Sequence, residues 1–327
     1  MQFKVSVVIP TYKRTELLRK CLECLKKQDL PAQDFEVLVV SDGPDSITEK
    51  LVNEMDGNIH FIQLHKKQGP AAARNLGWKN AHGHLIAFTD DDCLPQPDWL
   101  SSYCKEYKGE EVLVMTGRVI VPIEPPVTDY KKNISGLEAA DFITANCCCT
   151  KAALQKVGGF DERFSMAWRE DSDLEFKFIK EEINIRYKTP ATVIHPVRKA
   201  VWGISLKEQK KSMFNALLYK KYPELYRRKM TDAIPLIFYL MVLATVALII
   251  GWMIPHPEIV IVSAIVWLAC YISFLIRRLK STTLQFDHLF EMIITSIFIP
   301  YLSIYWNYYG WVKFKDRGPG AGDRAIV

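Results

Sequence analysis

Three consecutive carboxylates, Asp90, Asp91 and Asp92, follow the short apolar run 85–89. Like charges held this close repel one another, so a structure that keeps them together normally needs a cation. Carboxylate oxygens suit Mg²⁺ or Mn²⁺, and Mg²⁺ is commonly bound by one or two protein carboxylates together with substrate phosphates. The alternative is a solvated acidic turn. The position after a predicted strand favours a metal site, because ligands of parallel sheets bind at that edge.

Two other places carry groups that could take part in the same chemistry. Glu170 and Asp171 open a predicted helix over 171–181, and a carboxylate outside the metal group could remove a proton from an attacking hydroxyl. Simple capping is the alternative, since acidic side chains favour the first turn of a helix. His195 is a lone histidine, a residue type that is usually structural but can also be a metal ligand.

The elements that must position these residues alternate between strand and helix over the first hundred residues. Apolar, β-branched runs predict strands at 5–9, 35–40, 59–64 and 85–89, and helical periodicity predicts helices at 15–28, 47–55 and 70–80. This order indicates an α/β fold with a mostly parallel sheet covered by helices on both faces. Further on we expect a strand pair within 112–121, helix and turn over 137–160, and an extended segment over 183–193.

Several catalytic classes lack their motif in this sequence. No GxxxxGK[ST] loop supports P-loop phosphoryl transfer, no GxGxxG follows a strand, and no GxSxG nucleophile elbow is present. The Cys21 and Cys24 pair has no second pair at zinc-binding spacing, so we interpret both as helix positions, and 147–149 as small packed side chains. A metal-dependent nucleotide site at the sheet edge remains, and we expect no nucleic-acid partner.

The chain of 327 residues is 49% hydrophobic and 24% charged, enough for a sizeable core and about two domains. Two uncharged runs, 234–254 and 259–276, are each long enough to cross a bilayer. Lysine and arginine residues precede the first run at 227–229 and follow the second at 277–280, which predicts a hairpin with both flanks inside and 255–258 as its outer turn. The amino end has no export signal, so we expect the N-terminal part in the cytoplasm and a multi-pass protein of the plasma (inner) membrane.

Two more C-terminal segments bear on the membrane. Residues 201–230 are rich in lysine and arginine and predict a basic amphipathic helix in the headgroup region, with a solvated helix as the alternative. A third uncharged stretch, 292–312, contains Pro300 and several aromatic residues that favour the interface. We expect 281–327 to form an interfacial or re-entrant helix with a basic tail, and the two segments to form a platform for an acceptor presented at the membrane.

Six motifs in order resemble family 2 glycosyltransferases of the GT-A fold, over roughly residues 4–200. They are VSVVIPTYKR at 5–14, VVSDG at 39–43, GPAAARN at 69–75, the acidic triplet at 90–92, the Glu-Asp pair at 170–171, and His195. The resemblance implies inverting transfer of a sugar from a nucleotide diphosphate sugar, with Mn²⁺ or Mg²⁺. It also implies a GT-A nucleotide-binding sheet over 1–200, followed by the basic segment 201–230, the membrane hairpin 231–280 and the region 281–327.

The resemblance also assigns roles to individual residues. The nucleoside would be held by Pro10, Thr11, Tyr12, Arg14 and Asp42, with Arg74 nearby. Asp90 and Asp92 would be the metal-side carboxylates, and Asp91 would face the ribose or sugar. His195 would complete the metal or diphosphate site, and Asn146 would line the sugar and acceptor pocket, unless it is only a turn residue. Asp171, the second member of its pair with Glu170, would be the general base.

Departures from the family pattern limit what the resemblance implies. Processive synthases carry a Gln-x-x-Arg-Trp motif where this chain has Gln209-Lys-Lys-Ser212, so we infer one transfer per encounter. We therefore predict transfer of a single sugar to a membrane-presented, lipid-linked acceptor in glycan or cell-envelope synthesis. The alternatives are a polyprenyl-phosphate sugar synthase and a membrane-anchored nucleotide-binding scaffold without turnover. A nucleotidyltransferase is disfavoured, because no glycine-rich loop follows the first strand.

Overall fold

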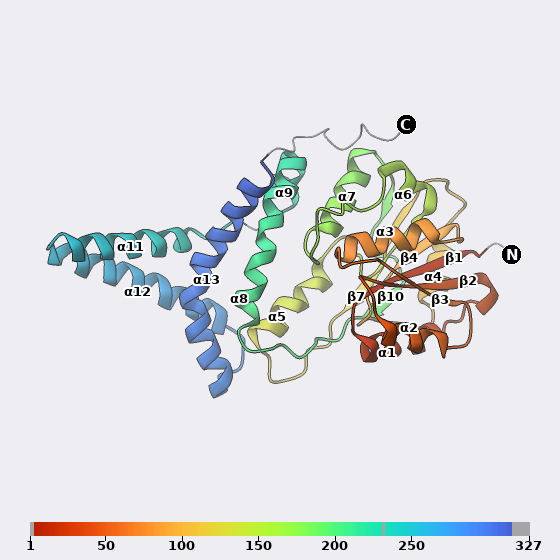
Figure 1. Ribbon diagram of the computed structural model, residues 1–327, viewed down its shortest axis with the longest axis horizontal. Coiled ribbons are helices and arrows are strands. Elements are labelled where there is room, and N and C mark those ends of the chain that lie inside the picture. The colour runs from red at the N-terminus through yellow and green to blue at the C-terminus, as the bar shows by residue number, and fades with distance from the viewer. Residues whose placement is uncertain (1–2, 231–232, 316–327) are drawn as a thin grey trace. The chain divides into compact units, whose positions relative to one another are not determined.

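The computed structural model describes residues 3–230 and 233–315, which form two compact units (Figure 1). The first unit comprises Met1–Pro122 and Ile134–Val197, and the second comprises Ile123–Asn133 and Arg198–Val327. The segment 123–133 therefore belongs with the C-terminal unit, although the sequence places it inside the predicted 1–200 domain. The basic tail after residue 315 lies outside the described residues.

The four strands predicted from the first hundred residues are present and form the parallel half of a sheet. They are β1 (Val5–Thr11), β2 (Phe35–Ser41), β3 (Ile59–Gln63) and β4 (Leu85–Phe88). In the described part of the chain the full sheet has the order β3-β2-β1-β4-β8-β6-β9. β1 pairs in parallel with β2 on one side and β4 on the other, so the chain reverses its winding direction there. Such a switch point is where α/β sheets bind ligands.

Helices cover both faces of this sheet, as predicted. Figure 1 shows α1 (Thr15–Leu25) and α2 (Ser46–Asn53) on one face and α3 (Pro70–Asn80) on the other. α3 lies very close to β1, because a Cβ added at Gly77 would be only 2.4 Å from Val8 Cγ1. The core between them is continuous and fully buried, which makes this edge of the sheet a rigid support for a site.

The second half of the unit differs from the prediction in two places. Residues 147–149, expected only as packed side chains, are part of the central strand β8 (Cys147–Thr150), which runs antiparallel to β4. The predicted strand pair within 112–121 is two strands in different sheets, β6 (Val114–Thr116) and β7 (Arg118–Ile120). Gly117 separates them, and a Cβ there would lie 2.2 Å from the Ala191 carbonyl oxygen.

The other elements of this unit complete the two sheets and their cover. The small sheet has the order β5-β10-β7. The remaining bounds are β5 (Leu94–Pro95), β9 (Ile185–Arg186), β10 (Thr192–Ile194), α4 (Trp99–Glu106), α6 (Lys151–Val157) and α7 (Glu170–Lys180). A short helix α5 (Asp129–Ser135) begins in the segment that belongs to the second unit.

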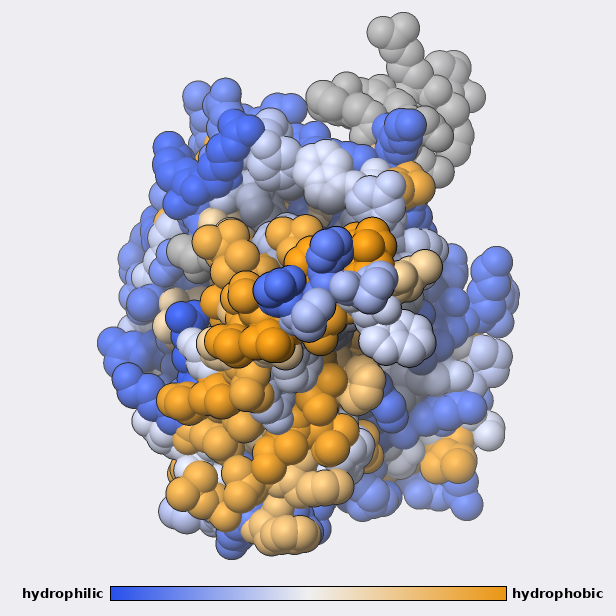
Figure 2. Space-filling model, turned by 90° about the vertical axis from the view of Figure 1, so that its left-hand side faces the viewer, coloured by the Kyte–Doolittle hydropathy of each residue, from blue (hydrophilic) through white to orange (hydrophobic). Residues whose placement is uncertain are grey.

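Three helices among the described residues of the second unit are long and apolar enough to cross a membrane. They are α11 (Leu236–Met253), α12 (Pro257–Leu279) and α13 (Phe286–Lys313). The first two correspond to the predicted spans and form a hairpin, packed closely where Gly251 meets Ile259. Figure 2 shows apolar side chains gathered over this side of the molecule.

The third helix, α13, is one continuous helix that does not reverse direction at Pro300. Figure 1 shows it running across the α11–α12 hairpin rather than alongside it. The Tyr301 hydroxyl lies 2.6 Å from Thr245 Oγ1 and accepts a hydrogen bond from Trp267 Nε1 at 2.9 Å, which ties α13 to both helices of the hairpin.

The basic segment forms α8 (Ile204–Glu208), a short 3₁₀ turn, α9 (Met213–Lys221) and α10 (Pro223–Lys229). The apolar residues of α9 are packed inside the protein, because 213–218 are buried, whereas Val201 and Trp202 before α8 are exposed. α9 packs so tightly on α13 that a Cβ at Gly310 would lie 2.2 Å from the Met213 carbonyl oxygen. Lys220 also donates to the Trp311 carbonyl oxygen at 2.6 Å. Lys207 and Lys210 are also exposed on this segment.

A buried ion pair joins the inserted segment 123–133 to this unit. Arg278, at the end of α12, donates to Asp129 Oδ2 at 2.8 Å and to the hydroxyls of Thr295 and Ser296 on α13. A buried charge needs such partners to offset its desolvation. The pair therefore fixes this segment to α12 and α13 of the second unit.

Candidate active site

The predicted site residues of the first unit lie at the ends of strands or at the start of a helix. Thr11 ends β1, Asp42 follows β2, and the acidic triplet follows β4. Glu170 and Asp171 form the first turn of α7, and His195 directly follows β10. Residues separated by more than one hundred positions in the sequence thus share one edge of the fold.

Four side chains form a group with metal-ligand chemistry. One ligand atom each from Asp90, Asp92, Cys93 and His195 lie within 4.8 Å of one another. His195 Nε2 is 3.8 Å from Asp92 Oδ1, and His195 Nδ1 is buried without a partner among the described residues. Two carboxylates and an imidazole suit Mn²⁺ or Mg²⁺, so the residues present fit the cation that the sequence predicts.

Cys93 is a member of this group that the sequence analysis did not single out. Burial raises the pKa of its thiol, and the neighbouring charges of Asp90 and Asp92 raise it further. Sulfur is a soft ligand, whereas Mg²⁺ and Mn²⁺ prefer carboxylate and other oxygen ligands. We therefore assign Cys93 to the packing beneath the site.

Asp91 points toward β1 rather than into the metal-ligand group. Its Oδ2 accepts a hydrogen bond from Thr11 Oγ1 at 2.7 Å, and Oδ1 accepts one from Arg14 at 3.1 Å. Burial raises its pKa to about 6, although the Arg14 charge opposes the shift. These contacts bridge the switch point between β1 and β4 and separate the role of Asp91 from that of its neighbours.

The carboxylates of Glu170 and Asp171 have different surroundings. Glu170 is 4% exposed, and its Oε1 accepts a hydrogen bond from Arg74 at 3.2 Å. Burial, together with the charge of Asp171, raises the pKa of Glu170 to about 7. Asp171 is half-buried and accepts from the Ser172 backbone N–H at 2.6 Å, and burial raises the pKa of its carboxyl as well. Asp171 is the more accessible of the two.

Arg74 was expected near the nucleoside, but its guanidinium lies between the two acidic groups. NH2 donates to Asp90 Oδ1 at 2.7 Å, and NH1 donates to Glu170. The side chain is only 3% exposed. Asp90 and Glu170 are therefore connected through the guanidinium of Arg74.

Two of the predicted nucleoside residues, Asp42 and Tyr12, lie next to the segment 67–69 that leads into α3. Asp42 Oδ1 accepts hydrogen bonds from the backbone N–H groups of Gln68 and Gly69, at 2.7 and 2.8 Å. Lys67 Nζ lies 4.4 Å from the centroid of the Tyr12 ring. Gly69 has φ +105°, and a Cβ there would lie 2.5 Å from the Ser165 carbonyl oxygen. The glycine in GPAAARN thus allows a close approach that sequence reasoning did not predict.

Asn146 is a core residue in the structure. Its amide nitrogen donates to the carbonyls of Arg118 and Ala191, and its oxygen accepts from Trp99 Nε1 and Tyr103 OH, both at 2.7 Å. All four hydrogen-bonding positions of the amide are used inside the protein, and the side chain is fully buried. Asn146 therefore has no hydrogen-bonding position left for a sugar, and we do not include it in the proposed sugar pocket. Pro10 likewise lies buried within β1.

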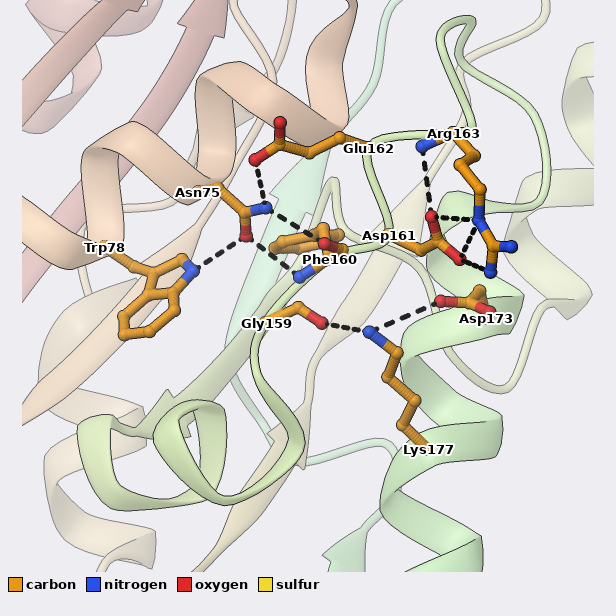
Figure 3. Close-up of polar contacts among 9 residues, drawn as sticks. All are labelled: Asn75, Trp78, Gly159, Phe160, Asp161, Glu162, Arg163, Asp173 and Lys177. Carbon is orange, nitrogen blue, oxygen red and sulfur yellow. Dashed lines mark hydrogen bonds and ion pairs between the residues drawn. The ribbon is translucent and has the colours of Figure 1, made fainter. Parts of the chain in front are cut away.

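The loop that leads to Glu170 is anchored at its beginning (Figure 3). Asn75 on α3 makes a pair of hydrogen bonds with the Phe160 backbone, both at 2.9 Å, and its amide nitrogen also reaches Glu162 Oε1. Lys177 on α7 donates to the Gly159 carbonyl oxygen at 2.6 Å. These contacts fix the loop from both sides before it reaches the first turn of α7.

Comparison with known proteins identifies the unit that holds this site. Residues 6–164 match the family described as Glycosyl transferase family 2. The chain carries a family 2 glycosyltransferase domain. The glycosyltransferase AglE of Haloferax volcanii is 34% identical over 35% of this chain and 39% of its own length. The chondroitin synthase of Escherichia coli is 26% identical over 69% of this chain and 39% of its own length.

Solved structures support the fold of the glycosyltransferase domain. The mannosyltransferase PcManGT of Pyrobaculum calidifontis aligns over 94% of this chain and 88% of its own, with 17% identity and a TM-score of 0.55. GalNAc-T7 aligns over 68% and 51%, with 14% identity and a TM-score of 0.51. At identities this low, the alignments establish the α/β fold with its parallel-rich sheet, as the sequence predicted, but they do not establish the substrate.

Proposed function

We propose that the protein transfers a single sugar, with inversion, from a nucleotide diphosphate sugar to a lipid-linked acceptor presented at a membrane. The observation that carries this proposal is the meeting of Asp90, Asp92 and His195 at the sheet edge, on the same unit as an accessible Asp171. A pure nucleotide binder does not need a second acidic group set apart from the first.

The donor class is supported by the relatives of known structure. PcManGT was solved with GDP-Man and Mn²⁺, and GalNAc-T7 with UDP, GalNAc and Mn²⁺. In this chain, Asp42 and Tyr12, which the resemblance assigns to the nucleoside, lie beside Lys67 and the start of α3. Asp42 Oδ2, which has no partner within the described part of the chain, is free to accept a hydrogen bond from a base.

Asp90, Asp92 and His195 would hold the cation. When bound, Mn²⁺ or Mg²⁺ acts as a Lewis acid that stabilises the charge of the departing diphosphate. Asp171 takes the proton of the acceptor hydroxyl as that oxygen attacks the anomeric carbon from the face opposite the leaving group. One displacement inverts the configuration, and the buried Glu170 is left to position its neighbour.

The membrane part of the proposal is supported by the second unit. Its hairpin is long and apolar enough to span, while α13 crosses it and carries aromatic residues that favour the interface. Lysines such as Lys207 and Lys210 are exposed on the segment packed against α13. Basic groups at a membrane surface attract the phosphates of a lipid-linked acceptor.

Two other functions stay open as alternatives. A polyprenyl-phosphate sugar synthase would use the same donor site with a simple lipid phosphate as acceptor. A membrane-anchored scaffold would bind the nucleotide sugar and release nothing. The reaction products separate these functions.

The direct test is release of nucleoside diphosphate from a panel of sugar nucleotides, using the full chain in detergent with a membrane lipid extract. We expect release with at least one donor, loss of release in EDTA, and recovery when Mn²⁺ or Mg²⁺ is added, because the leaving group needs the cation. Donor binding without release would favour the scaffold. Release that EDTA does not affect would contradict the metal site.

The proposed position of α13 at the membrane interface gives a second testable prediction. If α13 lies in the interface, a cysteine replacing Lys315 faces the cytoplasm, whereas one replacing His256, in the hairpin turn, faces outward. With the native cysteines replaced, we expect an impermeant maleimide to label His256→Cys in intact cells, and Lys315→Cys only after permeabilisation. Labelling of Lys315→Cys in intact cells would establish three spans and remove the interfacial assignment.

A further inference from the structure

Arg74 joins one of the metal-side carboxylates, Asp90, to the Glu170–Asp171 pair through its hydrogen bonds. It lies on α3 with its guanidinium almost completely buried, 2.7 Å from Asp90 Oδ1 and 3.2 Å from Glu170 Oε1. Both terminal nitrogens are thus used on carboxylates from two motifs that are 80 residues apart. The planar fork of arginine can make both contacts at once, which a lysine ammonium cannot do in the same geometry.

The buried carboxylate of Glu170 needs a positively charged partner, and the Arg74 guanidinium is that partner. Glu170 is buried, and its Oε2 has no hydrogen-bond partner in the described ranges 3–230 and 233–315. A carboxylate removed from water in this way is costly unless a positive group pairs with it. Asp90 is less buried, with 29% of its side chain exposed, so it can contact a ligand as well as Arg74.

On the basis of the proposed transfer reaction, we infer that Arg74 is a positioning residue and not a nucleoside ligand. It holds Asp90 in place for the cation and holds Glu170, and with it the first turn of α7, in place for the base Asp171. The orientation of Asp90 at one end and of Asp171 at the other then depends on one side chain that touches neither the donor nor the acceptor.

Arg74→Gln tests this role, because it keeps a polar side chain but removes the charge and the fork. We expect kcat to fall about 100-fold, the cost of a small displacement of a catalytic group. The KM for the donor should change by less than about threefold, because no contact with substrate is lost. The Mn²⁺ affinity of the protein without donor, measured by electron paramagnetic resonance, should rise about threefold or more, because a neighbouring positive charge has gone.

Arg74→Lys separates charge from geometry. The ammonium retains the charge, so we expect Mn²⁺ affinity close to that of the wild-type protein, but it reaches one carboxylate only, so kcat should still fall by about tenfold or more. Lys79→Gln, which removes an exposed charge from the same helix, is the matched control and should leave all three quantities unchanged. Thermal unfolding of each variant checks the fold, and Arg74→Lys decides the question if the glutamine variant does not fold.

The expected signature is a fall in kcat together with an increase in Mn²⁺ affinity. A raised donor KM with normal kcat would show instead that Arg74 binds the nucleoside or the diphosphate. Parallel losses of Mn²⁺ affinity, kcat and melting temperature would reduce it to a structural residue. Full activity of Arg74→Lys would show that the two simultaneous hydrogen bonds of the arginine guanidinium are not required, and would contradict the inference. Absence of turnover in the wild-type protein contradicts the proposed function itself, whereas wild-type turnover with unaffected Arg74 variants contradicts this inference alone.

Discussion

Asp171→Asn is expected to lower the rate of sugar transfer by about 10²–10⁴-fold, the usual contribution of a positioned general base. The amide keeps the size of the side chain but cannot accept the proton of the acceptor hydroxyl. Burial raises the pKa of the Asp171 carboxyl, so its ionised form is a stronger base than a solvated aspartate. Donor binding should persist, because Asp171 belongs to the first turn of α7 and not to the acidic triplet. Steady-state transfer and donor calorimetry on the purified variant measure the two effects separately.

The matched control is Glu181→Gln, which removes an exposed carboxylate at the other end of α7. It should transfer sugar at the wild-type rate. Near-normal turnover of Asp171→Asn would instead show that Asp171 only stabilises the helix start, as acidic residues in a first turn commonly do.

Asp92→Asn is expected to abolish metal-dependent donor binding while leaving the fold intact. Asp92 and His195 contribute to the same ligand group, and the neutral amide is a weaker ligand for a hard cation than a carboxylate. Calorimetric titration with donor and Mn²⁺ should show binding for the wild-type protein and none for the variant. In EDTA, the two proteins should behave alike.

Asp98→Asn serves as the control, since Asp98 is exposed six residues further along the chain. It should bind donor and Mn²⁺ normally. Unchanged affinity of Asp92→Asn would contradict the metal assignment and leave the acidic triplet as a structural turn.

Local sequence patterns determined the first half of the fold. Strands β1 to β4 and helices α1 to α3 were predictable because a buried parallel strand is a continuous apolar run and a covering helix repeats its apolar residues every three to four positions. The same patterns located Thr11, Asp42 and the acidic triplet at strand ends, where ligands bind. The two long apolar helices α11 and α12 were predictable from their long runs without charge.

Tertiary structure decided what depends on partners distant in sequence. The run 147–149 is a strand only because β4 and β6 pair with it, and Asn146 is a core residue only because Trp99 and Tyr103 fold onto its oxygen. The position of Arg74 between Asp90 and Glu170 depends on α3, β4 and α7 meeting at one edge. Asp129 joins the membrane unit through Arg278, 149 residues away. A local sequence pattern shows which face of one element is buried. It cannot show hydrogen bonds and ion pairs between elements, because these depend on how distant segments pack together.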